Sequence, residues 1–379
     1  MSTRKALTAF AVAELLFGVS AAGQNVTPDI TRAQSAAPRT SPAPSPDRNS
    51  VASKVSGMNA GAPVASPPNA PVFSLREPLE KAGYTRVSLK RIARSHITVD
   101  GRINRKEVKL IVDTGAPTSY LDLERVANFG PIWVSRDIDP ERMQLVRTAS
   151  VDAFALGAFS VGSRTVYDSP RDACNRARTS SGEEPVDGLL GADVLRSCGA
   201  IIDCASESLF LIHGDSTGRK APVALPPSAP AFSLQDSLKR AGYTRVNLKT
   251  IFSGYLAVDG RINGKHVKLI VDTGAPKTHL DSRQVTKCSL RWDGHYTELE
   301  YHQKVRTARV DTFEVGSFRV GRLRVGEHSL GDVNRIGRSY DEAPVDGLLG
   351  CEILYYCRAI IDYSSGYLFL AHRDGPDGK

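Results

Sequence analysis

The chain contains the same domain-sized unit twice, and this duplication constrains its fold more than any other feature. The unit begins with APVFSLREPLEKAGYTRVSLKRI at Ala70 and again with APAFSLQDSLKRAGYTRVNLKTI at Ala229, an offset of 159 residues. The offset is kept to the end of the chain, where Asp203 matches Asp362, and about half of the aligned positions are identical. Each copy is long enough to bury a core of its own. We therefore expect two tandem domains, over residues 71–215 and 230–374.

The residues outside the two units have the composition of an export signal and of linkers. Arg4 and Lys5 precede a mostly apolar stretch, Ala6–Val19, which small residues follow, so we predict a signal peptide over residues 1–22. Because Glu14 interrupts the stretch, an amphipathic or disordered N-terminus is the alternative. Residues 23–70 and 216–229 are rich in Pro and small residues and are expected to be extended linkers. The chain would then be exported, to the periplasm, the cell surface or the medium, with no integral membrane span.

Composition excludes several other classes. The 49 Lys and Arg residues exceed the 41 acidic residues by only +8, and no motif for nucleic-acid binding accompanies the surplus. No His or Cys spacing typical of a metal site occurs, and no Walker or Rossmann motif, so we expect neither metal nor cofactor. Six cysteines permit up to three disulfides, although only Cys198 and Cys357 occupy matching positions and Cys351 is not expected to pair with Cys357.

The pattern within each unit predicts a mostly β structure with one or two short helices. In the first copy, Leu75 and Leu79 share one face of a helix that Gly83 ends. Strands are predicted over TRVSLKRI, around Ile97, over VKLIV, on both sides of Gly157, and in a closing AIIDCASESLFLI hairpin, with a turn at Asp100-Gly101. VDGLLGADVLRS is interpreted as a strand, a glycine and a short helix.

The most informative motif is KLIVDTGAP, at Lys109–Pro117 and again at Lys268–Pro276. An apolar strand that runs directly into Asp-Thr-Gly places a carboxylate at the end of a buried strand. The glycine N–H can approach that carboxylate, and the threonine hydroxyl can tie down the turn. Two such carboxylates facing each other cannot both ionise, so the pair holds one proton and can activate one water.

The unit resembles the retropepsin-like aspartic proteases. The resemblance rests on the apolar strand leading into DTGA, on Leu189-Leu190-Gly191 and Leu348-Leu349-Gly350 before a short helix, and on Ile201-Ile202-Asp203 and its copy Ile360-Ile361-Asp362. It covers residues 93–213 and 252–372. It implies two acid-protease β-barrels that form a pepsin-like pseudo-dimer.

The same resemblance implies the site residues. Asp113 and Asp272 would be the catalytic pair, one from each copy. Thr114 and Thr273 would make hydrogen bonds across the interface beneath them, and Gly115 and Gly274 would complete the supporting loop.

Two departures from relatives stand in both copies. Pro117 and Pro276 remove a backbone donor where relatives carry other residues. Ala116 and Ala275 stand where pepsins have Ser or Thr, so one hydroxyl donor to the carboxylate is lost and we expect a pair less acidic than that of pepsin.

Substrate specificity is expected from a flap hairpin within the poorly matched stretches, Trp133–Met143 and Trp292–His302. The alternative is that these stretches are surface loops that diverged after the duplication.

These observations predict an exported, metal-independent aspartic endopeptidase that acts on polypeptides. Three alternatives stay open: an inactive peptide-binding module on the same fold, a protease whose units pair between chains as a homodimer, and a surface-attachment protein. A monomer that pairs its own two units is the favoured arrangement.

Overall fold

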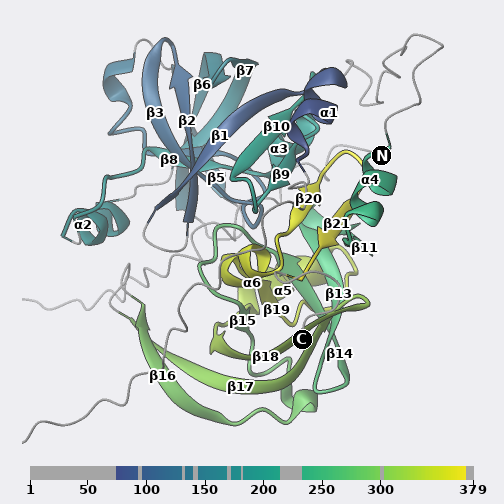
Figure 1. The fold of residues 1–379 in the computed structure, drawn as a ribbon. Helices are drawn as coiled ribbons and strands as arrows, with labels where there is room; N and C mark the ends of the chain where they lie inside the picture. Colours follow the sequence, from purple (N-terminus) through teal and green to yellow (C-terminus); the bar gives the residue numbers. More distant parts are fainter. Residues whose placement is uncertain are drawn as a thin grey trace, which may run out of the picture. The chain divides into compact units, whose positions relative to one another are not determined.

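The computed structural model describes residues 74–92, 96–129, 133–139, 144–168, 172–180, 182–213, 233–298 and 303–372 (Figure 1). The predicted signal peptide (1–22) and linkers (23–70 and 216–229) lie outside the described residues. No helix in the described part of the chain is long and apolar enough to cross a membrane.

The first repeat consists mainly of strands. Its elements, in chain order, are α1 (Arg76–Lys81), β1 (Thr85–Ile92), β2 (His96–Ile103), β3 (Lys106–Val112), β4 (Tyr120–Leu121), the 3₁₀ turn η1 (Ala127–Phe129), β5 (Trp133–Asp139), β6 (Gln144–Leu156), β7 (Phe159–Asp168), α2 (Asp172–Ser180), β8 (Gly188–Leu190), α3 (Ala192–Ser197), β9 (Ile201–Asp203) and β10 (Ser208–Leu211).

The second repeat follows the same order, with two short strands, β11 and β12, where the first repeat has β1. Its elements are α4 (Leu234–Arg240), β11 (Thr244–Asn247), β12 (Lys249–Thr250), η2 (Phe252–Gly254), β13 (Leu256–Ile262), β14 (Lys265–Val271), β15 (His279–Leu280), η3 (Thr286–Cys288), β16 (Trp292–Glu298), β17 (Gln303–Val315), β18 (Phe318–Glu327), α5 (Gly331–Ser339), β19 (Gly347–Leu349), α6 (Cys351–Tyr356), β20 (Ile360–Asp362) and β21 (Tyr367–Leu370).

Each repeat forms a closed barrel of six strands. In the first repeat the strand order is β2-β3-β8-β4-β7-β6, and β6 pairs back with β2. In the second it is β13-β14-β19-β15-β18-β17, closed by β17 on β13. The mostly β, two-barrel architecture expected from the sequence is confirmed.

The turn predicted at Asp100-Gly101 is wrong. Strand β2 continues through both residues to Ile103, and the chain reverses at Asn104 and Arg105, whose φ angles are +48° and +68°. Two successive residues with positive φ make the tight hairpin turn that matches strand twist. Gly101 instead lies opposite Leu156 where the barrel closes, and a Cβ there would lie 2.8 Å from the Ala155 carbonyl oxygen. Glycine is needed at this position because the two strands approach each other closely.

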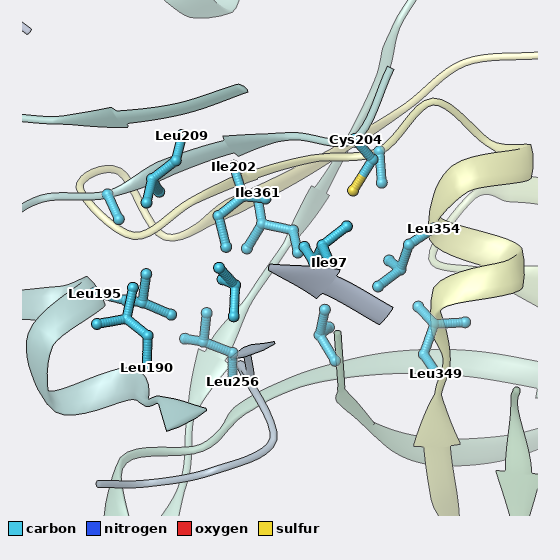
Figure 2. Packing of buried hydrophobic residues seen from close by; sticks show 14 of the residues in the cluster. Ile97, Leu190, Leu195, Ile202, Cys204, Leu209, Leu256, Leu349, Leu354 and Ile361 are labelled. Carbon is cyan, nitrogen blue, oxygen red and sulfur yellow. The ribbon is translucent and has the colours of Figure 1, made fainter. Parts of the chain in front are cut away.

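The two repeats share a sheet and a core. Strand β20 pairs antiparallel with β9, and Ile202 lies opposite its own duplicate, Ile361. Ile97 and Ile202 of the first repeat belong to the same buried cluster as Leu256, Leu349 and Ile361 of the second (Figure 2). Because this apolar surface would be exposed if the repeats separated, its burial favours their association.

The cysteines do not form the disulfides that their number permits. Five of them, Cys198, Cys204, Cys288, Cys351 and Cys357, are free and buried, while the side chain of Cys174 lies outside the description. Burial raises the pKa of the Cys198, Cys288 and Cys351 thiols. They therefore act as small apolar side chains.

Candidate active site

The two Asp-Thr-Gly loops begin where buried strands β3 and β14 end. Each strand pairs in parallel with the short GLL strand, β8 or β19. The pairing continues one residue further, since Asp113 N–H donates to the Leu190 carbonyl at 3.0 Å and Asp272 N–H donates to that of Leu349 at 3.0 Å. The apolar sequence before each aspartate thus fixes where its carboxyl emerges.

The short helices after the GLLG motifs hold the far side of each loop. Ala192 N–H donates to the Ala116 carbonyl at 2.8 Å, and Cys351 N–H donates to that of Ala275 at 2.8 Å. The backbones approach so closely that a Cβ on Gly191 would lie 2.2 Å from the Thr118 carbonyl oxygen. Only glycine permits this contact.

Thr114 and Thr273 exchange hydrogen bonds across the two repeats. The Thr114 hydroxyl donates to the Val271 carbonyl at 2.7 Å and accepts from Thr273 N–H at 3.0 Å. The Thr273 hydroxyl donates to the Val112 carbonyl at 2.7 Å and accepts from Thr114 N–H at 3.0 Å. All four bonds are buried, so they bind the two loops into one rigid unit.

The two aspartates lie above this unit, and each faces the glycine of the other loop. A Cβ on Gly115 would lie 2.4 Å from Cγ of Asp272, and one on Gly274 would lie 2.3 Å from Cγ of Asp113. Both aspartates are fully buried. The structure therefore brings together all six residues that the sequence singled out: Asp113, Thr114, Gly115, Asp272, Thr273 and Gly274.

Burial and the neighbouring carboxyl of Asp113 hold the pKa of Asp272 well above its usual range. The hydrogen bonds that Oδ1 of Asp272 accepts from Gly274 N–H, at 2.8 Å, and from Ala275 N–H, at 2.9 Å, act in the opposite direction. Desolvation is the larger effect, so the pair favours a state that retains a proton.

A buried polar chain from the first repeat reaches the second loop. Glu183 accepts from Arg178 at 3.2 Å, Arg178 lies 3.2 Å from Nδ1 of His96, and Nε2 of His96 lies 3.0 Å from the Gly274 carbonyl oxygen. His96 and Arg178 are 1% and 2% exposed. An arginine can only donate, so Nδ1 of His96 accepts and Nε2–H donates to Gly274.

Sequence reasoning did not predict this buried series of hydrogen-bonded side chains. The positions that correspond to His96 and Arg178 in the second repeat are Tyr255 and Gly337. The one sequence observation that pointed to these residues is that the two repeats differ at both positions. Such a difference does not by itself distinguish a change of function from random divergence.

The two stretches proposed to contain flaps form β-hairpins in the described residues. Strands β5 and β6 pair from Trp133↔Ser150 to Asp139↔Gln144, and β16 pairs with β17 in the second repeat. Strand pairing is compatible with both readings, so the assignment of these hairpins as flaps stays a prediction. In the second hairpin the Tyr296 hydroxyl lies 2.8 Å from Nε2 of His279, and Lys277 lies over the tyrosine ring.

The described residues contain no cluster of His, Cys, Asp or Glu that could hold a metal ion.

A family model of known proteins matches part of the second repeat. Residues 258–355 match the family model of the gag-polyprotein putative aspartyl protease, a segment that contains Asp272 and the second GLLG motif. The match covers about a quarter of the chain and supports the resemblance of the second repeat to the retropepsin-like aspartyl proteases.

Among solved structures, the chain is similar to a retropepsin-like aspartic protease from Rickettsia conorii. The identity is 19% over 34% of this chain and 90% of that chain, with a TM-score of 0.25. A search of curated proteins gave no match.

Proposed function

We propose that the chain is an aspartic endopeptidase in which one water, held between Asp113 and Asp272, attacks the peptide bond. The observation that carries the proposal is the reciprocal packing of the two loops, in which Gly115 lies against Asp272 and Gly274 against Asp113. Such packing directs both carboxyls to one point, and two carboxyls that share one proton can supply both a base and an acid.

The proposed reaction has two steps. The ionised carboxyl takes a proton from the water while the protonated one donates to the scissile carbonyl oxygen, and the water oxygen bonds to the carbonyl carbon. The resulting tetrahedral intermediate collapses when the carboxyl that took the proton from water donates it to the nitrogen, the C–N bond breaks, and a hydroxyl proton of the intermediate passes to the other carboxylate. The raised pKa of Asp272 supports a pair that holds one proton at the start.

The threonines and glycines would keep the two carboxyls in register. The buried bonds between Thr114 and Thr273 leave the loops little freedom to separate. A site that is already organised before substrate binds loses little energy to rearrangement during the reaction.

The proposed pair lacks one donor that pepsins have. Ala275 offers its N–H to Asp272 but has no hydroxyl, so activity should extend to less acidic pH than in pepsin. A pH–rate profile with both limbs below about pH 4 would contradict this reading.

The test is cleavage of a denatured protein mixture from about pH 3 to pH 7, the range in which carboxyl pairs titrate. The wild-type chain is compared with Asp113→Asn, Asp272→Asn and, as a matched control, the exposed Asp311→Asn. If either dyad substitution abolishes cleavage and the control does not, both aspartates serve one site.

Two other outcomes point elsewhere. If each single variant keeps about half of the activity, each site contains two copies of one aspartate, as in units paired between chains. If the wild-type chain never cleaves, with or without its first 70 residues, the peptide-binding alternative is favoured.

A further inference from the structure

Lys277 is the one exposed residue in the loop that leads from Asp272 to strand β15. The residues from Asp272 to Ala275 are buried, Pro276 is half-buried, and the chain is buried again from Thr278 through β15. A substrate that reaches Asp272 passes beside this loop. Lys277 is therefore the side chain that the loop offers to it.

The backbone on which Lys277 stands is held from several sides. Thr278 N–H donates to Oε1 of Glu352 at 2.5 Å, and the Thr278 hydroxyl accepts from Gly350 N–H at 3.0 Å. The Thr278 carbonyl accepts from Gly326 N–H at 2.9 Å. A Cβ on Gly350 would lie 2.3 Å from the carbonyl carbon of Lys277. This close packing fixes where the lysine side chain begins relative to the aspartate of the same loop.

The side chain of Lys277 is held as well. Its Nζ lies 4.0 Å from the centre of the Tyr296 ring, which belongs to strand β16. The Tyr296 hydroxyl lies 2.8 Å from Nε2 of the buried His279, so the ring itself is kept in place. A cation over an aromatic face gains a modest attraction and keeps its other side open to an anion. The ammonium group thus lies between the loop and the β16–β17 hairpin.

No carboxylate competes for this ammonium group among the side chains that the structure describes. None of them forms an ion pair with Lys277, although most other basic residues of the second barrel that border a strand end do find one, such as Lys268 with Glu342 at 3.3 Å. An ammonium group has three donors and no acceptor. Its natural ligand is an anionic group supplied by another molecule.

The lysine occurs in one copy of the loop only. Lys277 and His279 correspond to Thr118 and Tyr120 in the first repeat. Thr118 is neutral and half-buried. An extended peptide that lies across both loops would therefore meet a positive charge on one side of its cleaved bond and none from the matching position on the other side.

We propose that Lys277 selects substrates that carry an aspartate or glutamate side chain on one side of the scissile bond. The selection rests on the proposed function, because it concerns what the same site accepts. Lys277 stands five positions after Asp272, so the two are separated by at most about 18 Å of extended chain. Because an extended substrate rises about 3.3 Å per residue, the acidic residue lies within about five positions of the cleaved bond.

The first test maps cleavage sites in a denatured protein mixture at about pH 5.5, where the aspartate and glutamate side chains of the substrate are ionised. Mass spectrometry of the new termini should show acidic residues enriched at one position on one side of the cut. Lys277→Gln should lose this enrichment, and Lys277→Glu should replace it by lysine or arginine. Lys239→Glu, an exposed lysine of helix α4, is the matched control and should keep the wild-type pattern.

The second test compares two synthetic peptides of the best-cleaved sequence, with Glu or Gln at the enriched position. The wild-type chain should show a kcat/KM about fivefold higher for the Glu peptide, the size expected of an exposed ion pair, and the ratio should fall as salt is added. In Lys277→Gln the ratio should approach one. Because the ratio is taken within each variant, a general loss of activity or stability does not affect it.

The outcomes separate this inference from the proposed function. Cleavage that shows no acidic enrichment, or a Glu to Gln ratio that Lys277→Gln leaves unchanged, overturns the role of Lys277 while the aspartic mechanism stands. If the wild-type chain cleaves nothing, or Asp272→Asn cleaves as well as the wild type, the proposed function fails and the specificity of the site is refuted with it.

Discussion

His96 of the first repeat donates a hydrogen bond of 3.0 Å to the carbonyl oxygen of Gly274, in the loop of the second aspartate. The N–H of the same glycine donates to Asp272 at 2.8 Å. A histidine of one repeat thereby orients the peptide that holds the carboxyl of the other. Since Tyr255 occupies the corresponding position of the second repeat, the two aspartates are supported differently.

Replacing His96 should impair catalysis more than binding. In His96→Leu the Gly274 carbonyl loses its donor, and we expect kcat to fall by about tenfold with KM nearly unchanged. His96→Gln keeps a donor at the position of Nε2 and should recover most of the rate. Steady-state kinetics check this; a wild-type kcat in the leucine variant would show that His96 has no positioning role.

The buried threonine exchange should be needed for stability. Thr114→Val leaves the Val271 carbonyl and the Thr273 N–H without partners, and each such group costs about 1–3 kcal/mol. We expect the free energy of unfolding in urea to fall by about 2 kcal/mol or more. Thr114→Ser keeps the hydroxyl and serves as the matched control. Equal stability of the two variants would contradict the prediction.

The ionised state of Asp272 should reduce stability at neutral pH. Because its pKa is raised in the folded protein, the folded state binds its proton more tightly than the unfolded state does. The contribution of protonated Asp272 to the free energy of unfolding is therefore complete below the unfolded pKa. It is lost as the pH rises through the folded pKa. Asp272→Asn keeps the Oδ1 that accepts from Gly274 and Ala275 but carries no charge.

We thus expect Asp272→Asn to melt a few degrees above the wild-type chain at about pH 7, and the difference to shrink toward pH 4. Thermal melts at both pH values measure it, with Asp311→Asn as the control. A difference that does not depend on pH would mean that the charge of Asp272 is not the cause.

His279 should limit stability in acid. Its burial, and next the charge of His328, lower its pKa from 6.5 to about 3. The unfolded state therefore takes up a proton on His279 at a higher pH than the folded state does. The contribution of His279 to the free energy of unfolding is present above the unfolded pKa and is lost as the pH falls below it.

At pH 5 this loss amounts to about 2 kcal/mol, which His279→Gln should abolish while it keeps a donor for Tyr296. Urea unfolding at about pH 7.5 and pH 5 tests this. Exposed His266→Gln is the control, and an unchanged pH dependence in His279→Gln would refute the assignment.

Local patterns explain which parts of the fold were predictable. Each apolar strand that leads into Asp-Thr-Gly is encoded by one continuous stretch of sequence, and so is the short helix that follows Gly191. Such elements can be predicted from neighbouring residues alone. The turn at Asn104 and Arg105 was missed because an Asp-Gly pair nearby gives a stronger turn signal, and only the closure of the barrel uses Gly101 in a strand.

The sequence by itself determined the duplication and the β class, and it singled out the six residues of the candidate site, because all of these follow from repeated motifs. Tertiary structure alone decided that His96 and Arg178 reach the loop of the other repeat. The physical reason is that hydrogen bonds and cavities join residues far apart in sequence, and no local spacing encodes which of them meet.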